Sequence, residues 1–224
     1  MITSSKGKTS RNVRAVDNFP SFATMQWAAV ALLLALLTGC GGKTPPLPRL
    51  GAGDVIVAFG DSLTYGTGAA ENESYPAVLA QLTGRKVVRA GAPGEITAQA
   101  LRRLPGVLSE HKPRLVIVCL GGNDMLRKVS EAETIANLRA IVRKVNDSGA
   151  HAVLVGVPRP ALLTSAPRFY AEIAQEFGIP YEGAAVTSVL YKPEFKSDPI
   201  HPNAAGYRRI AEAIAGLLRR AGAV

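Results

Sequence analysis

Residues 55–66 read VIVAFGDSLTYG, an apolar run that passes directly into a turn rich in small and polar residues. The run has the composition of a parallel strand that is covered on both faces. Gly60 allows a tight bend after the strand, and Ser62 then lies on the turn into the next helix. Ligands meet such sheets at the carboxyl ends of the strands, so this serine is placed where a nucleophile has to be. A plain turn of the same composition stays open at this point, because Gly, Asp and Ser favour turns for conformational reasons alone.

Short apolar runs alternate with stretches of helical period through the rest of the chain. This alternation predicts an α/β fold in which a parallel sheet is covered on both faces by helices. The predicted strands are residues 55–59, 86–90, 115–120, 152–157 and 179–181. The predicted helices are residues 75–82, 98–108 and 131–146, and a last helix that Asn203 caps.

Three more motifs stand at or near the same edge of the predicted sheet. The run SDPIHPN, residues 197–203, has Asp198 and His201 three positions apart in a loop stiffened by two prolines. That spacing can hold a carboxylate against one imidazole nitrogen and leave the other nitrogen to face a serine. GGND, residues 121–124, offers the side-chain amide of Asn123, and AGAPGE, residues 90–95, offers the backbone amide of Gly94. Both follow predicted strands, so their donors are expected beside Ser62.

In combination, these motifs resemble the SGNH, or GDSL, hydrolase superfamily, and within it the arylesterase, thioesterase and lysophospholipase group. The resemblance covers residues 54–218. It implies a three-layer α/β/α, flavodoxin-like fold with a five-stranded parallel sheet. It also implies that Ser62 is the nucleophile, that Asp198 and His201 complete a catalytic triad, and that the Ser62 amide, Gly94 and Asn123 donate to the oxyanion.

The chain departs from the family pattern at two positions close to these motifs. Arg89 stands where members often have Asn, and we expect it to alter the strand end or the charge near the site. Pro93 stands where they often have Ser, and we expect it to stiffen the Gly94 turn. The α/β-hydrolase fold is a weaker match, because its GxSxG motif requires Gly where this chain has Thr64 and because its acid and His lie far apart in sequence.

The predicted reaction is hydrolysis of a carboxylic ester or thioester through an acyl-enzyme, which needs no metal or organic cofactor. Leu126, Leu162, Leu163 and Phe169 follow strand ends and are expected to line an apolar acyl site. They favour fatty-acyl esters, thioesters or lysophospholipids as small-molecule substrates. Two alternatives stay open: an envelope carbohydrate O-acetylesterase, and a non-catalytic lipoprotein that binds a ligand in the same cleft.

Residues 1–39 have the features of a secretory signal. A basic stretch precedes an apolar run, residues 27–37, that is shorter than the ~20 residues needed to span a bilayer. The run ends in LTGC, residues 37–40, which resembles the lipobox of bacterial lipoproteins and implies acylation of Cys40. An uncleaved anchor or a buried helix is the alternative. Residues 40–53 are predicted to be the lipidated Cys and a Gly/Pro-rich tether, and residues 54–224 the hydrolase domain. The protein is therefore expected to be exported and anchored to a membrane of the bacterial envelope, at the outer membrane or the periplasmic face.

The net charge of the chain is +9, and the predicted signal contributes four cations and one acid. Its removal takes away +3 and leaves +6, which suits anionic envelope polymers or lipid head groups. No nucleic-acid partner is predicted, since aromatic residues are sparse and the arginine pairs 102/103, 208/209 and 219/220 are assigned to solvated helix faces. Cys119 is predicted to be a small core residue. The domain is expected to be a monomer.

Overall fold

The structure of the protein is a computed structural model that describes residues 1–3, 44–160 and 165–224. Residues Thr44–Val224 form one compact unit. Residues 4–39 of the predicted signal and Cys40 lie outside the described residues, as do Leu162 and Leu163. No helix within the described part is long and apolar enough to cross a membrane.

A five-stranded parallel sheet forms the centre of this unit, with strand order β2-β1-β3-β4-β5. The strands are β1 (Val55–Gly60), β2 (Lys86–Gly91), β3 (Leu115–Cys119), β4 (His151–Val155) and β5 (Tyr181–Glu182). The α/β class and all five predicted strands are confirmed, with the bounds shifted by at most two residues. The central strands β1 and β3 are almost wholly buried, as their continuous apolar sequences predict.

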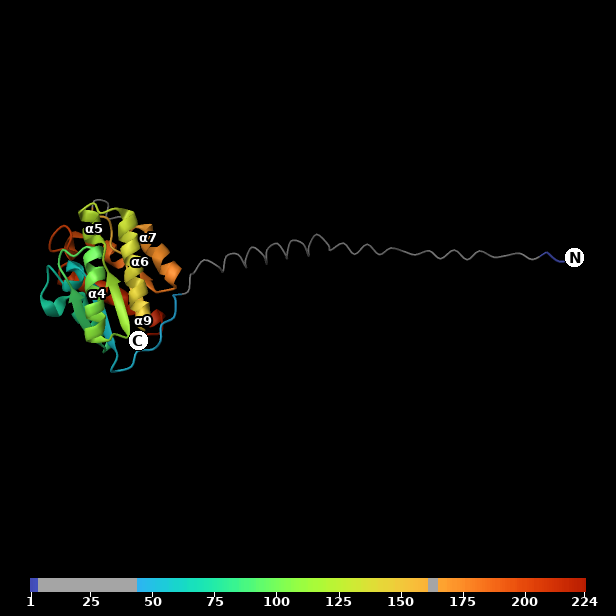
Figure 1. Cartoon of the computed structure of the whole chain (residues 1–224), viewed down its shortest axis with the longest axis horizontal. Helices are drawn as coiled ribbons and strands as arrows, with labels where there is room; N and C mark the ends of the chain where they lie inside the picture. The colour runs from blue at the N-terminus through green and yellow to red at the C-terminus, as the bar shows by residue number, and fades with distance from the viewer. Residues whose placement is uncertain (4–43, 161–164) are drawn as a thin grey trace. The chain divides into compact units, whose positions relative to one another are not determined.

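Helices cover both faces of the sheet. One layer contains α4 (Thr97–His111), α6 (Glu131–Asp147) and α7 (Arg168–Phe177), which pass in front of the strands in Figure 1. The other contains α3 (Tyr75–Thr83), α8 (Ala185–Tyr191) and α9 (Ala204–Arg220). Short helices α2 (Ser62–Tyr65) and α5 (Gly122–Leu126) follow β1 and β3, and single 3₁₀ turns occur at Glu71–Glu73 and Pro193–Phe195. Asn203 caps α9 as predicted, since its side-chain oxygen accepts from the Gly206 amide at 3.0 Å.

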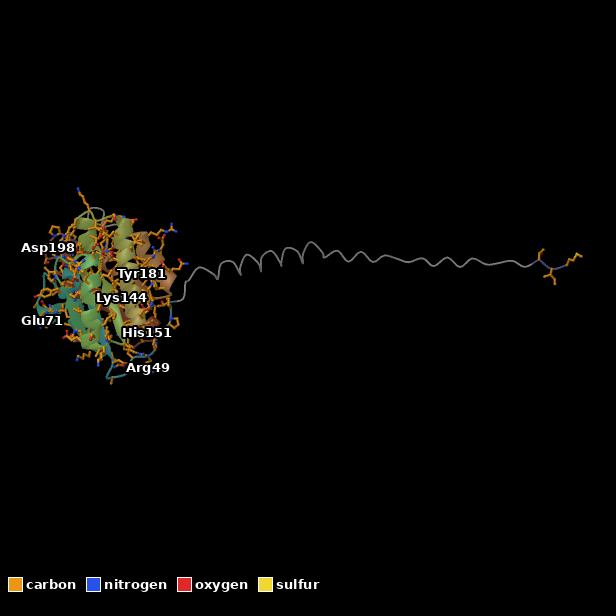
Figure 2. The ribbon with its side chains drawn as sticks, in the orientation of Figure 1. Arg49, Glu71, Lys144, His151, Tyr181 and Asp198 are labelled. Carbon is orange, nitrogen blue, oxygen red and sulfur yellow. The ribbon has the colours of Figure 1, made fainter. Side chains whose placement is uncertain are left out.

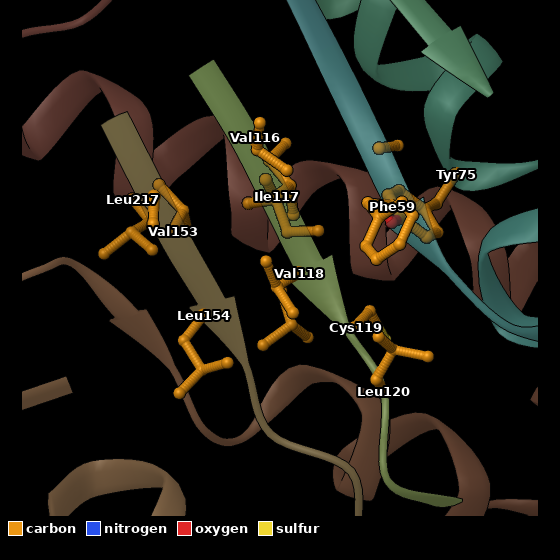
Figure 3. Close-up of a cluster of buried hydrophobic side chains, with 14 of the residues drawn as sticks. Phe59, Tyr75, Val116, Ile117, Val118, Cys119, Leu120, Val153, Leu154 and Leu217 are labelled. Atoms are coloured by element: carbon orange, nitrogen blue, oxygen red, sulfur yellow. The ribbon is translucent and has the colours of Figure 1, made fainter. Parts of the chain in front are cut away.

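The core lies between the sheet and these helices. Figure 3 shows side chains of β1, β3 and β4 together with Tyr75 of α3 and Leu217 of α9. Cys119 is among them and is buried, as predicted. The core makes the sheet a rigid base for the loops at its carboxyl edge.

The register of the sheet brings three of the predicted motifs to one level. Gly60, the last residue of β1, pairs with Gly91 of β2 on one side and with Cys119 of β3 on the other. The three strands therefore end side by side. Each then passes within a few residues to a predicted site residue: Ser62, Gly94 or Asn123.

The compact unit begins at Thr44, ten residues before the predicted boundary, which corrects the assignment of residues 44–53 to a tether. The Leu47 amide donates to the Ala221 carbonyl and the Leu50 amide to the Ala223 carbonyl, both at 2.8 Å, and the Leu50 side chain is buried. The Gly and Pro content of this segment suggested a free tether, although two of its leucines pack against the end of α9. Residues 44–50 therefore run beside the C terminus, at the end of the domain opposite α5 (Figure 1).

Candidate active site

The turn after β1 places Ser62 at the start of α2. A Cβ atom on Gly60 would lie 2.4 Å from the Cys119 carbonyl oxygen and 2.2 Å from Thr64 Oγ1, so the bend requires glycine. Asp61 caps the short helix by accepting from the Leu63 amide at 3.0 Å. This cap fixes the orientation of the first turn of α2, and with it the position of Ser62.

The structure brings the three predicted triad residues together. His201 Nε2 lies 3.0 Å from Ser62 Oγ, and His201 Nδ1 lies 2.7 Å from Asp198 Oδ2. Ser62 and His201 are 139 positions apart in sequence, so this contact is made by the fold alone. The imidazole is 15% exposed, which leaves it accessible from the cleft while most of its surface is packed. The three side chains form one continuous hydrogen-bonded chain.

The loop before α9 holds Asp198 in place. Its Oδ1 atom accepts from the amides of Ile200 and His201, both at 2.9 Å, which leaves Oδ2 for the imidazole. Desolvation raises the pKa of Asp198, but the hydrogen bonds from the His201 ring and from the two amides outweigh it, so the pKa lies below its usual value. Asp198 is therefore a carboxylate at neutral pH, and it lies at the upper edge of the domain in Figure 2, away from Arg49 and His151.

A tight turn presents Gly94. The Glu95 amide donates to the Ala92 carbonyl at 3.2 Å, and Gly94 has a φ of 76°. Pro at the second position and a positive-φ Gly at the third are the sequence of a type II turn. Pro93 therefore fits the turn that it was predicted to stiffen. The Ala92 amide donates to the Gly60 carbonyl at 2.9 Å, which ties the turn to the end of β1.

Asn123 lies in α5, in the same cleft as Ser62 and His201. Its Nδ2 atom donates to Asp61 Oδ2 at 3.2 Å and to the Glu95 carbonyl at 3.1 Å. Both hydrogens of the amide are thus engaged in this state. The two bonds connect the Ser62 turn, the Gly94 turn and the Asn123 helix, so the three predicted donor segments form one network. Gly94 itself does not line the cleft, although its neighbour Glu95 bonds to Asn123.

Acidic residues of this network were not predicted from the sequence. Asp61, Glu95 and Asp124 are all buried, and the Asp124 carboxylate accepts from the backbone and hydroxyl of Thr97. Burial raises the pKa of Asp61 to about 7; the Leu63 hydrogen bond opposes this shift, and the nearby Asp124 and Glu95 add to it. The only sequence signal was position, because Asp61 and Glu95 each follow a glycine near a strand end and Asp124 follows Asn123 in the GGND motif.

Asp61 should make the stability of the protein depend on pH. Its folded-state pKa lies above the ordinary value of 3.8, so its contribution is fully present below about pH 4 and is lost as the pH rises through 7. A shift of this size corresponds to about 4 kcal/mol. We therefore expect the free energy of unfolding of the wild type, relative to Asp61→Asn, to fall by about that amount between pH 4 and pH 8. Urea titrations of both proteins across this range measure the difference, and parallel curves would contradict it.

Arg89 lies away from the cleft. Its guanidinium donates to the Tyr65 carbonyl at 2.6 Å, pairs with Glu71 and stacks 4.6 Å from the centre of the Tyr65 ring. It thus fastens the segment after Ser62 to β2, and it does not line the pocket. Its effect on the strand end or on the charge near the site stays a prediction.

The cleft beside Ser62 is mainly apolar. Leu126 lines it, as predicted, whereas Phe169 does not: that side chain is buried in the core beside Tyr170. The sequence could not separate the two, because both were expected after strand ends and their burial is set by the fold: Leu126 is exposed at the end of α5, whereas Phe169 packs into the core from α7. The other apolar lining residues are Leu63, Val157, Pro158, Pro160, Leu190 and Ile200.

Comparisons with known proteins agree with this geometry. The GDSL-like Lipase/Acylhydrolase family matches residues 58–209. The chain is 33% identical over 186 residues to thioesterase 1/protease 1/lysophospholipase L1 of Escherichia coli, covering 80% of this chain and 85% of that protein. It is 29% identical over 192 residues to esterase TesA of Pseudomonas aeruginosa, covering 79% of this chain and 93% of that protein. A crystal structure of TesA superposes with a TM-score of 0.65 at 26% identity, covering 75% of this chain and 99% of that one. The chain belongs to the GDSL-like lipase/acylhydrolase family of SGNH hydrolases and is an esterase of that family.

Proposed function

We propose that Ser62 is the nucleophile of this esterase, with His201 as its general base and Asp198 as the residue that orients the imidazole. The observation that carries the proposal is the hydrogen-bonded chain from Ser62 Oγ through His201 to Asp198, with distances of 3.0 and 2.7 Å. An unassisted serine hydroxyl is a poor nucleophile. His201 takes its proton as Ser62 Oγ attacks the ester carbonyl and returns that proton to the departing alcohol or thiol. Water then releases the acid from the acyl-enzyme by the same route.

The oxyanion is stabilised, in this proposal, by the amides of Ser62 and Gly94 and by the side chain of Asn123. Among the described residues, neither amide has a hydrogen-bond acceptor, which leaves both available to a substrate oxygen. Asn123 has to share or exchange one of its two present bonds, and the bond to the Glu95 carbonyl is the one to a neutral acceptor. The bond to Asp61 keeps the amide in place, and the hydrogen that faces the Glu95 carbonyl is shared with the oxyanion.

The substrate class that fits the cleft is an ester or thioester with an apolar acyl chain. Eight of the residues that line the cleft are Leu, Val, Ile, Pro or Gly, and Leu126 is nearly half exposed at its mouth. An acyl chain would cover this surface, with a gain of ~0.8 kcal/mol for each buried methylene. The names of the relatives, a lysophospholipase and thioesterase from Escherichia coli and an esterase from Pseudomonas aeruginosa, support the same class.

Hydrolysis rates across p-nitrophenyl esters of increasing chain length, measured beside an acetylated glycan, test this function. We expect kcat/KM to rise from acetyl to acyl chains of about eight carbons, because each methylene adds apolar contact. Activity confined to acetyl groups would favour the glycan O-acetylesterase. Absence of all turnover, together with no labelling by a fluorophosphonate, would favour a binding protein.

We further propose that the chain is exported and anchored through a lipid on Cys40. The lipobox-like sequence LTGC supports this, as does the position of the first described residues of the domain. Leu47 and Leu50 pack beside the C terminus of α9, whereas Ser62 and His201 lie at the other end of the strands. The domain that follows the predicted anchor in sequence thus begins at the end of the sheet away from the cleft.

Cys40→Ala is expected to abolish uptake of labelled palmitate and to leave an unprocessed or mislocalised precursor, since acyl chains supply ~0.8 kcal/mol of membrane binding per buried methylene. Metabolic labelling and membrane fractionation in a bacterial host measure both effects. Cys119→Ala is the matched control, because Cys119 is buried and should leave labelling unchanged. Wild-type protein that takes up no palmitate would contradict the anchor without affecting the esterase assignment.

A further inference from the structure

Arg103 is not on a solvated helix face, in contrast to the prediction for the arginine pair 102/103. Its side chain is 30% exposed, and its Nε and Nη2 atoms donate to the two carboxylate oxygens of Glu95 at 2.8 and 2.6 Å. The guanidinium also stacks 4.5 Å from the centre of the Phe59 ring. A two-point pair of this kind fixes the angle of both groups as well as their distance.

The same guanidinium binds the ends of two strands. Nη2 lies 3.3 Å from the Gly60 carbonyl oxygen and 3.2 Å from the Ala90 carbonyl oxygen. Gly60 precedes Ser62 by two residues, and Glu95 directly follows Gly94. One side chain of α4 therefore connects the segment that carries Ser62 with the turn that carries Gly94.

We propose that Arg103 is a positioning residue for the esterase reaction, which, paired with Glu95, sets the position of the Gly94 amide relative to Ser62. The proposal rests on the proposed role of the Gly94 amide as an oxyanion donor. Such a donor is effective only if it is already in place when charge develops on the oxygen. A displacement of about 1 Å at a reacting centre can cost up to ~10²-fold in rate.

Charge explains why this position needs an arginine. Glu95 is 9% exposed and lies near the buried Asp61, which Asp124 also approaches. Without Arg103, its carboxylate would be unpaired in a poorly solvated place beside like charges, and it would move toward water. The backbone of Glu95 accepts from Asn123, so this movement would disturb Gly94 and Asn123 together.

A second arginine contacts the turn but cannot replace the first. Arg127 Nη2 donates to the Gly94 carbonyl at 2.8 Å from the surface of the molecule. It makes one bond to a neutral acceptor in contact with solvent, where such bonds contribute little. Arg103 makes four polar contacts from a half-buried position, so the turn depends mainly on Arg103.

Kinetics of Arg103→Met and Arg103→Lys test the proposal, with Arg102→Met as the matched control on the exposed face of α4. We expect Arg103→Met to lower kcat by ~10- to 100-fold with KM changed less than about twofold, because the donors to the oxyanion act on the transition state and not on the bound substrate. Arg103→Lys keeps the charge but loses the two-point pair, and we expect it to recover only part of kcat. In Arg103→Met/Glu95→Gln the loss should be smaller than the product of the single losses, since both variants remove one pair.

Each outcome is read at a temperature at which circular dichroism shows the variant folded. A folded Arg103→Met with wild-type kcat and a lowered melting temperature would overturn the proposal, since it would show a purely structural role. If Arg103→Met does not fold, Arg103→Lys decides in the same way. Wild-type protein without any ester turnover would refute the proposed function itself, which is a different result.

Discussion

Replacing His201 with alanine is expected to lower kcat by roughly 10⁴-fold or more, because His201 is placed to take the proton of Ser62 Oγ as the ester carbonyl is attacked. Among the described residues, His201 Nε2 is the only side-chain atom within hydrogen-bonding distance of that oxygen. The binding cleft stays intact, so KM should change little. Steady-state hydrolysis of a p-nitrophenyl ester by the purified variant measures the loss.

Two variants separate loss of the base from a general effect of removing a ring. His111→Ala takes a histidine from the end of α4, where it lies near Glu110 and far along the helix from the cleft, and should leave kcat unchanged. Asp198→Ala should cost less than His201→Ala, since it removes the orienting group and leaves the base. A His201→Ala enzyme that retains most of its turnover and its reaction with a fluorophosphonate would refute the assignment.

The fold was predictable because its strands are apolar in a way that only buried parallel strands require. Residues 55–59 and 115–120 were found almost to the residue, since nearly every side chain in them faces a helical layer. Composition misled at residues 44–53, where glycines and prolines suggested a free tether. Leu47 and Leu50 nevertheless bond to the end of α9, more than 170 positions later in the chain, and no local pattern reports such a contact.

The candidate site also contains residues that the sequence predicts and residues that it does not. Ser62, Gly94, Asn123, Asp198 and His201 could be predicted because each stands in a short motif at or near a strand end. The raised pKa of Asp61 could not be predicted. In sequence Asp61 looks like an ordinary turn residue, and its pKa depends on burial and on Asp124 and Glu95 from other segments. Arg103 looked no different from Arg102, because their separation into a bound and a solvated side chain depends on carbonyls up to 43 positions away.

Asn123→Ala is expected to lower kcat by ~10²–10³ and to change KM little, because a bond to the oxyanion strengthens as charge develops in the transition state. The structure adds a second consequence. The variant also removes a hydrogen bond from the buried Asp61 carboxylate and another from the Glu95 carbonyl. Some loss of stability should therefore accompany the loss of rate, and a fall in melting temperature does not by itself argue against a role in catalysis.

Asn137→Ala separates the two effects. Asn137, in α6, donates from its side-chain amide to Thr97 Oγ1 at 3.1 Å and does not line the cleft. The Asn137→Ala variant should lose stability, though less than Asn123→Ala because it removes one hydrogen bond and not two, and it should keep wild-type kcat because the lost bond does not reach the reacting atoms. Both quantities are measured on one preparation of each variant, with kinetics well below the melting temperature. If Asn123→Ala behaves as Asn137→Ala does, the side chain of Asn123 only braces the two turns, and the oxyanion is held by the amides of Ser62 and Gly94.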